Sequence, residues 1–121
     1  MDNITHSLLG VALSDLALRS GAPKAERRMF VGAGIIAANL PDLDVVYAGI
    51  TRSPLGYLLH HRGHTHTVLG SVVLAVALVM VYRRLPPIRK LRPGDRARLW
   101  LLIVTALASH LPLDTLNNYG V

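Results

Sequence analysis

Long apolar stretches alternate with short polar segments along the 121-residue chain. The apolar stretches are rich in alanine, leucine, valine and glycine and show no strand-like alternation, which favours helices. None reaches the roughly 20 residues of a comfortable membrane span, although the third is apolar on all sides, as expected of a helix in lipid. We therefore predict one all-α domain over residues 1–121, a four-helix membrane-embedded bundle made of two helical hairpins, with helices over residues 4–18, 29–40, 68–82 and 99–113.

A weak internal repeat supports two hairpins. The sequence THSLLG at residues 5–10 resembles THTVLG at residues 65–70, and the two return helices end in Leu-Pro, at residues 40–41 and 111–112. Each copy opens a helix, passes through a basic loop and returns to the same surface. The alternative is a chance similarity between apolar helices.

The distribution of charge predicts an orientation in a membrane. The chain has a net charge of +6, yet 11 of its 13 lysines and arginines lie in two segments, 19–28 and 83–98. If each apolar stretch crosses the inner membrane, both segments face the cytoplasm by the positive-inside rule. There we expect them to contact anionic lipid headgroups. The chain lacks a recognised nucleic-acid-binding motif, so we expect no nucleic-acid partner; a homodimer is compatible with its small size.

All six histidines fall on the opposite side, together with several aspartates. His110 and Asp114 are four residues apart, so their side chains share one helical face and reach the same point. Zinc accepts nitrogen and oxygen ligands of this kind. Pro112 between them removes one backbone N–H, and we expect it to open the helix locally. The alternative is a histidine hydrogen-bonded to an aspartate at a helix end.

A histidine-rich tract, HHRGHTH at residues 60–66, lies on the same side. Such tracts are typical of metal binding. Gly63 permits a tight turn that brings His61 and His66 round to one site, and Arg62 is placed to hold an anionic substrate oxygen. The alternative is a solvated polar loop.

Two carboxylates and one more histidine complete the polar side. Asp42 and Asp44 follow Pro41, which we expect to stop the second helix. In extended backbone both carboxylates would bind one ion or bridge two, whereas in a helical turn they diverge and one is structural. A turn in which an aspartate bonds its own backbone is the alternative. His6 corresponds to His66 in the repeat.

Together these groups predict a site for one or two divalent ions, most simply zinc. Such an ion would offset the mutual repulsion of the carboxylates and lower the pKa of a coordinated water to about 7. Without any cysteine, metal-activated water is the most available nucleophile. We assign catalytic roles to Asp44 and Arg62. The predicted metal ligands are His6, Asp42, Asp44, His61, His66, His110 and Asp114.

Four segments carry a family resemblance: THSLLGVAL, LPDLDVV, HRGHTHTVLG and SHLPLDTLNNYG. In this order they resemble the motifs of the YdjM-like family of membrane-bound metal-dependent hydrolases. The arrangement is also distantly similar to the all-helical zinc phospholipase C and single-strand nuclease class. Carried over by position, this resemblance implies His6, Asp42 or Asp44, His61 or its neighbours, His110 and Asp114 as ligands. That class has further ligands downstream of its H-x-x-x-D motif, whereas this sequence stops at Val121. We therefore expect either a minimal or a C-terminally truncated version.

The leading functional hypothesis is a metal-dependent hydrolase of the inner membrane, with its His/Asp cluster on the side opposite the cytoplasm. We expect it to act on a phosphate ester of lipid or envelope material, with membrane lipids as its surroundings. The alternative is a membrane protein that binds metal without catalysis.

Overall fold

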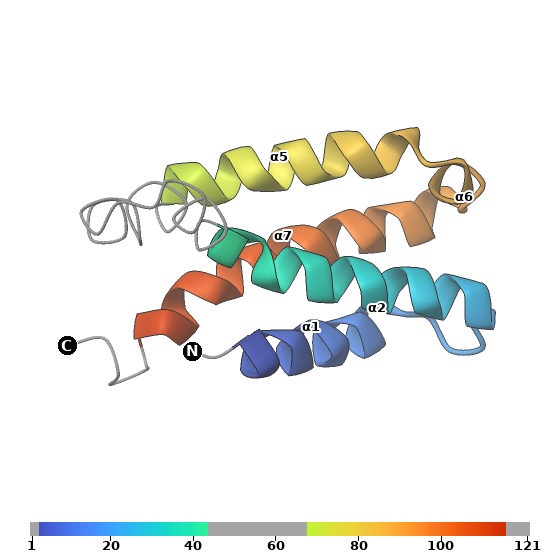
Figure 1. Ribbon diagram of the computed structural model, residues 1–121. Helices are drawn as coiled ribbons and strands as arrows, with labels where there is room; N and C mark the ends of the chain where they lie inside the picture. The colour runs from blue at the N-terminus through green and yellow to red at the C-terminus, as the bar shows by residue number, and fades with distance from the viewer. Residues whose placement is uncertain (1–2, 44–67, 116–121) are drawn as a thin grey trace.

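The computed structural model describes residues 3–43 and 68–115, and all its regular elements in these ranges are helical (Figure 1). The predicted all-α class is thereby confirmed for the described residues. The elements, in chain order, are α1 (Asn3–Ala17), α2 (Lys24–Asn39), the 3-10 helix η1 (Leu40–Leu43), α5 (Val68–Arg84), α6 (Pro86–Arg89) and α7 (Pro93–Thr115).

The described helices form two hairpins. Helices α1 and α2 run antiparallel side by side, and α5 returns through the short helix α6 into α7 (Figure 1). Helix α7 packs against α1, α2 and α5, whereas α5 packs mainly against α7. As a result, both basic segments lie at one end of the bundle, and the start of α1 and the end of α7 lie at the other.

Two helices begin earlier than the apolar pattern predicts. Helix α2 starts at Lys24, directly after Pro23, and α7 starts at Pro93. Proline suits the first turn of a helix because its missing N–H has no partner there in any case. Each first turn also holds an acidic residue, Glu26 or Asp95, which the helix dipole favours. Parts of both basic segments are therefore helical.

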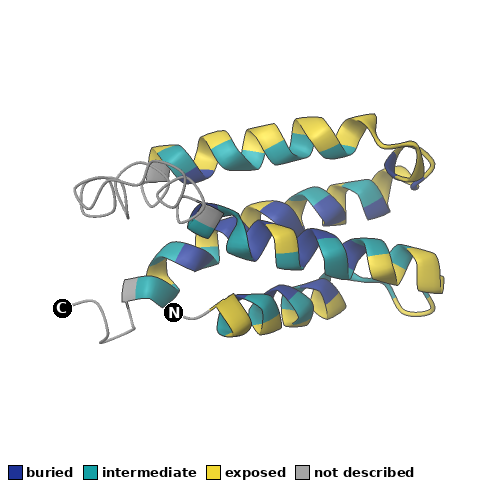
Figure 2. Cartoon of the chain, viewed as in Figure 1, coloured by how far each residue is buried: buried dark blue, intermediate teal, exposed yellow. Residues whose placement is uncertain are grey.

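The core lies between α2 and α7. Phe30, Ala33 and Ala37 of α2 face Leu99, Ile103 and other buried side chains of α7. The small alanines let the two helices approach closely, while the large aliphatic residues come from α7. Figure 2 shows that the buried positions follow these facing surfaces. The core thus fixes the position of α7 relative to α2 along most of their length.

Helices α1 and α2 approach each other even more closely. A Cβ atom added to Gly10 would lie only 2.6 Å from the carbonyl oxygen of Gly34, so the two backbones are in direct contact. Ser14, one turn further along α1, donates a hydrogen bond to the carbonyl of Gly10 (2.6 Å) and reaches that of Phe30 (3.0 Å). Small residues at a helix interface are typical of helix pairs in membranes.

One described helix is long and apolar enough to cross a membrane, namely α7 over Pro93–Asp114. Helices α1, α2 and α5 have 15, 16 and 17 residues. At about 1.5 Å per residue they extend roughly 22–26 Å, less than the about 30 Å of a hydrocarbon core. The four-span arrangement therefore stays a prediction.

Candidate metal centre

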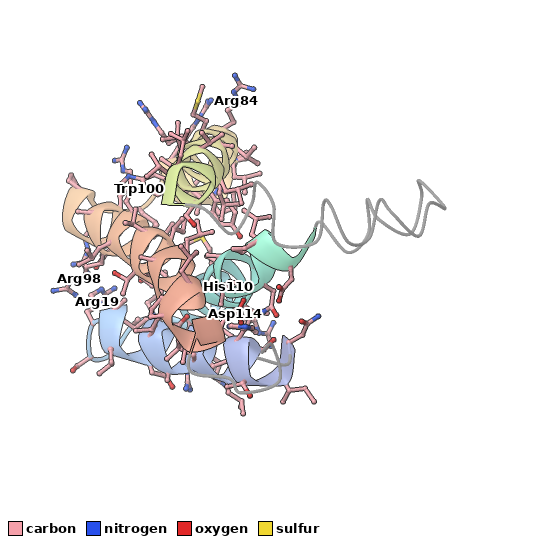
Figure 3. The ribbon with its side chains drawn as sticks, turned by 90° about the vertical axis from the view of Figure 1, so that its left-hand side faces the viewer. Arg19, Arg84, Arg98, Trp100, His110 and Asp114 are labelled. Atoms are coloured by element: carbon pink, nitrogen blue, oxygen red, sulfur yellow. The ribbon has the colours of Figure 1, made fainter. Side chains whose placement is uncertain are left out.

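Four predicted ligands meet at the end of the bundle away from the basic segments. His6 comes from the first turns of α1 and Asp42 from η1, while His110 and Asp114 come from the last turns of α7. Figure 3 shows His110 and Asp114 on the part of α7 that lies beside α1 and α2. Segments distant in sequence therefore converge on one point.

The ring nitrogen Nε2 of His110 is the centre of this cluster. It lies 3.3 Å from Oδ1 of Asp42 and 3.2 Å from Oδ2 of Asp114. The other carboxylate oxygen of Asp114 lies 3.2 Å from Nε2 of His6. One ligand atom each from His6, Asp42 and His110 lie within 4.8 Å of one another. Asp114 thus contacts both histidines of this group.

A backbone hydrogen bond fixes the orientation of the His110 ring. Its Nδ1 lies 2.7 Å from the carbonyl oxygen of Ala38 and donates to it. In the neutral imidazole the proton is then on Nδ1, and the lone pair of Nε2 points at the two carboxylates. A histidine that binds a metal usually donates its other N–H to a carbonyl or carboxylate in this way.

Both histidines are removed from solvent. His6 is 1% exposed and His110 is fully buried, whereas the side chains of Asp42 and Asp114 are 19% and 15% exposed. The two rings stack on each other. The Nδ1 atom of His6 is buried and has no hydrogen-bond partner among the described residues. A buried polar atom without a partner is costly, so the described side chains leave one nitrogen of His6 unsatisfied.

The distances fit a coordinated ion as well as long hydrogen bonds. Charge-assisted N–H···O bonds are usually about 2.7–2.9 Å long. Two ligands on a zinc tetrahedron with bonds of roughly 2.0–2.2 Å are about 3.3–3.6 Å apart. The separations between His110 Nε2 and the oxygens of Asp42 and Asp114 lie near this second range. Two nitrogens and two carboxylates also match the ligands that zinc prefers.

The electrostatics of Asp42 agree with a cation-binding position. Burial acts to raise the pKa of its carboxyl, but the hydrogen bond with His110 and the positive charge of the nearby imidazoles outweigh it. The pKa of Asp42 is consequently lower than the ordinary 3.8. The carboxyl is therefore ionised at neutral pH and available as a ligand.

Local interactions around Asn39 hold the end of α2 in place. The side-chain amide of Asn39 donates to the carbonyl of Ile35 (2.8 Å) and to the hydroxyl of Ser7 on α1 (3.1 Å). Pro41, two residues after Asn39, is fully buried. Pro41 ends α2 as expected, but the chain continues as the 3-10 turn η1, so Asp42 lies in a helical turn and not in extended backbone.

The last turns of α7 differ from the prediction at Pro112. The helix continues through this residue to Thr115 and is not interrupted there. The tertiary contacts of His110 and Asp114 on either side hold the backbone helical despite the missing N–H. Sequence reasoning found these two residues, but it did not find Ala38, which contributes only its carbonyl and has no side-chain signal.

The remaining predicted site residues lie outside the described ranges. They are Asp44, His61, Arg62 and His66. Their assignment as ligands or catalytic residues stays a prediction.

Comparisons with known proteins place the chain among membrane proteins. Residues 1–121 match the family described as YdjM inner membrane protein. The chain is 28% identical over 127 residues to "Uncharacterized protein YfhP" of Bacillus subtilis (strain 168), covering 99% of this chain and 36% of that protein. It is 35% identical over 88 residues to "Inner membrane protein YbcI" of Escherichia coli (strain K12), covering 73% of this chain and 47% of that protein.

The chain therefore spans between about a third and a half of the length of these relatives. No solved structure shows significant similarity to it. The distant similarity to the zinc phospholipase C and single-strand nuclease class thus stays a prediction.

Proposed function

The chain belongs to the YdjM inner membrane protein family, and from this premise we propose that it is a membrane-bound metal-dependent hydrolase. Its substrate would be a phosphate ester of lipid or envelope material. The proposal includes an inner-membrane location, with the two basic segments on the cytoplasmic side and the His/Asp cluster on the other.

One observation carries the proposal: His6, Asp42 and His110 each offer one ligand atom, these atoms lie within 4.8 Å of one another, and Asp114 contacts both histidines. A structural hydrogen-bond network would satisfy its buried donors and acceptors. Here Nδ1 of His6 has no partner among the described residues, and His110 is oriented by Ala38 with Nε2 toward two carboxylates. This arrangement supports a site for one cation.

Each residue of the proposed site would have a separate role in hydrolysis. When bound, a divalent ion would lower the pKa of a coordinated water to about 7 and polarise a phosphoryl oxygen. Asp42 and Asp114 bring negative charge to balance it, and the bond to Ala38 holds the imidazole of His110 in place. In our proposal Arg62 binds an anionic oxygen of the substrate, and Asp44 completes the carboxylate set.

The surface of the bundle supports a membrane location. Large apolar side chains are exposed on α1 and α5, among them Leu8 and Leu16 of α1 and Leu69 and Val73 of α5. These two helices lie at the two edges of the bundle (Figure 2). Apolar patches of this extent mark contact with lipid or with other proteins. The two basic segments lie together at the opposite end from the His/Asp cluster, which agrees with the proposed orientation.

Metal content is the decisive test. The full chain, purified in detergent, is expected to retain close to one equivalent of zinc or a related divalent ion. The His110→Ala and Asp114→Ala variants should lose it, whereas Ser109→Ala, which removes a hydroxyl that donates to the backbone carbonyl of Ala106, should not. Wild-type protein that binds no ion stoichiometrically would refute the proposal.

The burial of both histidines favours a second candidate, a membrane protein that binds metal without catalysis. His6 and His110 are almost inaccessible to solvent, and structural zinc sites are closed while catalytic ones keep an open position. Metal-loaded protein screened with phosphodiester and phospholipid substrates separates the two. Turnover that disappears in the His110→Ala variant supports the hydrolase, and stoichiometric metal without turnover supports the alternative.

A further inference from the structure

A pocket at the corner between α5 and α7 is lined mainly by arginines. It has a volume of about 420 Å³ and lies where α6 joins the two helices, at the end of the bundle away from the His/Asp cluster. Its size is within the range of ligand pockets, about 300–1,000 Å³. The lining residues are Met80, Arg83, Arg84, Ile88, Arg89 and Arg96.

The local sequence explains why these arginines gather. Helix α6 begins with two prolines, and its Ile88 is buried against the bundle, which anchors the corner. This anchor brings Arg89 of α6 beside the last turn of α5, where its Nε donates to the carbonyl of Arg83 (3.3 Å). Arg96, in the first turns of α7, donates to the carbonyl of Leu91 (3.4 Å). The corner thus holds four guanidinium groups close together.

None of these four arginines has a carboxylate partner in the described part of the chain. This contrasts with the neighbouring arginines 19, 92 and 98, which all approach Asp95, and with Arg27, which pairs with Asp15. Like charges gathered around one pocket repel one another. A bound anion would relieve this repulsion, and arginine binds phosphate oxygens through paired N–H groups.

An exposed apolar stripe on α5 ends in the same pocket. Leu69, Val73, Val76 and Met80 lie at helical spacing on one face of α5 and are 53–74% exposed. Met80 at the end of this stripe also lines the arginine pocket. A ligand that fits both features is anionic at one end and apolar along its length. A soluble phosphate or a nucleic acid would leave the stripe without a partner.

We propose that this pocket binds the phosphate headgroup of an anionic phospholipid, with the acyl chains along the α5 stripe. The charge pattern of the sequence predicts only a diffuse attraction of both basic segments to anionic lipid. The pocket instead predicts a defined site for one lipid molecule, formed by the 83–98 segment and not by the 19–28 segment. This inference rests on the proposed membrane location and not on metal chemistry.

The test titrates each lipid into the full chain in detergent. Native mass spectrometry counts the lipid molecules bound at each concentration, and the affinities for different lipids are compared. We expect one phosphatidylglycerol to bind at least about tenfold more tightly than phosphatidylcholine. The Arg84→Gln/Arg96→Gln double variant should lose this preference. The matched control Lys24→Gln/Arg28→Gln removes the same charge from the other basic segment and should keep it, because neither residue lines the pocket.

Three results would overturn the proposal. One is an equal loss of binding in both double variants, which indicates diffuse attraction. Another is displacement of the lipid by inorganic phosphate at equal concentration, which indicates a site for a soluble anion. The third is an unchanged preference for phosphatidylglycerol in Arg84→Gln/Arg96→Gln, which would place the bound lipid elsewhere. The charge-conserving variant Arg84→Lys/Arg96→Lys guards against misfolding and should bind more weakly than wild type, because lysine lacks the paired guanidinium contacts. Metal content should not change in any of these variants, so this site and the proposed metal centre are tested separately.

Discussion

The imidazole rings of His6 and His110 stack with their centroids 4.0 Å apart and their planes 17° apart. Two positive charges at this distance would repel by about 4 kcal/mol at an effective dielectric constant of about 20. The two stacked imidazoles are therefore poorly suited to being protonated and positively charged at the same time. A single cation bound by the imidazoles and the two carboxylates avoids this repulsion. The variants of His110, Asp42 and Asp114 below test for such an ion.

The bond between His110 and Ala38 allows the ligand role of His110 to be separated from its structural role. Asparagine places an amide N–H near the position of Nδ1 but has no atom at Nε2. We expect His110→Asn to keep the bond to the Ala38 carbonyl, to destabilise the protein by about 1–3 kcal/mol through the smaller side chain, and to lose bound metal. Metal content by mass spectrometry and thermal unfolding by circular dichroism provide the two readouts. Retention of a full equivalent of metal would exclude Nε2 as a ligand.

The two carboxylates should respond differently to neutralisation. Asp42 belongs to the compact group with His6 and His110 that could hold an ion. Asp114 contacts both histidines, so it could act either as a ligand or by orienting the two imidazole rings. If Asp114 orients the ligands, Asp114→Asn should weaken metal binding about 10- to 100-fold while keeping the stoichiometry at one. Asp42→Asn should abolish stoichiometric binding. Metal titration of the apo variants measures both effects.

These two variants also bear on the choice between catalysis and simple binding. Three protein ligands leave one tetrahedral position open for water, while four close the site. If Asp114→Asn abolishes binding as completely as Asp42→Asn does, the site has four protein ligands in this region and the non-catalytic alternative is favoured.

The lowered pKa of Asp42 predicts a loss of stability in acid. A carboxyl whose pKa is lower in the folded than in the unfolded state stabilises the fold above its ordinary value, here 3.8. This contribution is lost as the pH falls through the folded value. Without metal, the thermal midpoint of the wild type should therefore fall between about pH 5 and pH 2. In Asp42→Asn the fall should be shallower; an identical acid limb in the two proteins would contradict this.

The sequence predicts the helical class and the convergence of four candidate site residues because both follow from local patterns. Apolar stretches separated by basic segments define the helices, and the spacing of His110 and Asp114 places them on one face. Since both return helices end near the same surface, Asp42 and His6 were also predicted to join them. The structure brings these four residues together.

The helix boundaries and the supporting backbone contacts could not be predicted from local sequence patterns. Polar residues 24–28 and 93–98 are helical because a proline precedes or starts each helix and an acidic side chain favours its first turn, which hydrophobicity does not record. The Ala38 carbonyl and the contact between Gly10 and Gly34 depend on how α1 and α2 pack. A glycine in an apolar helix gives no indication of which backbone it will touch.

The contact between Gly10 and Gly34 leads to the last prediction, because it sets the position of His6 relative to α2. A methyl group on Gly10 would lie 2.6–2.9 Å from backbone atoms of Gly34 and Ile35, which cannot move independently. Gly10→Ala should therefore destabilise the protein by about 1–3 kcal/mol and weaken metal binding by displacing His6. Gly32→Ala on α2 is the matched control: a Cβ there meets nothing within 4 Å, so this variant should be neutral or more stable by up to about 1 kcal/mol. Thermal unfolding and metal titration of both variants measure these effects, and equal behaviour of the two would show that the backbone contact does not position the site.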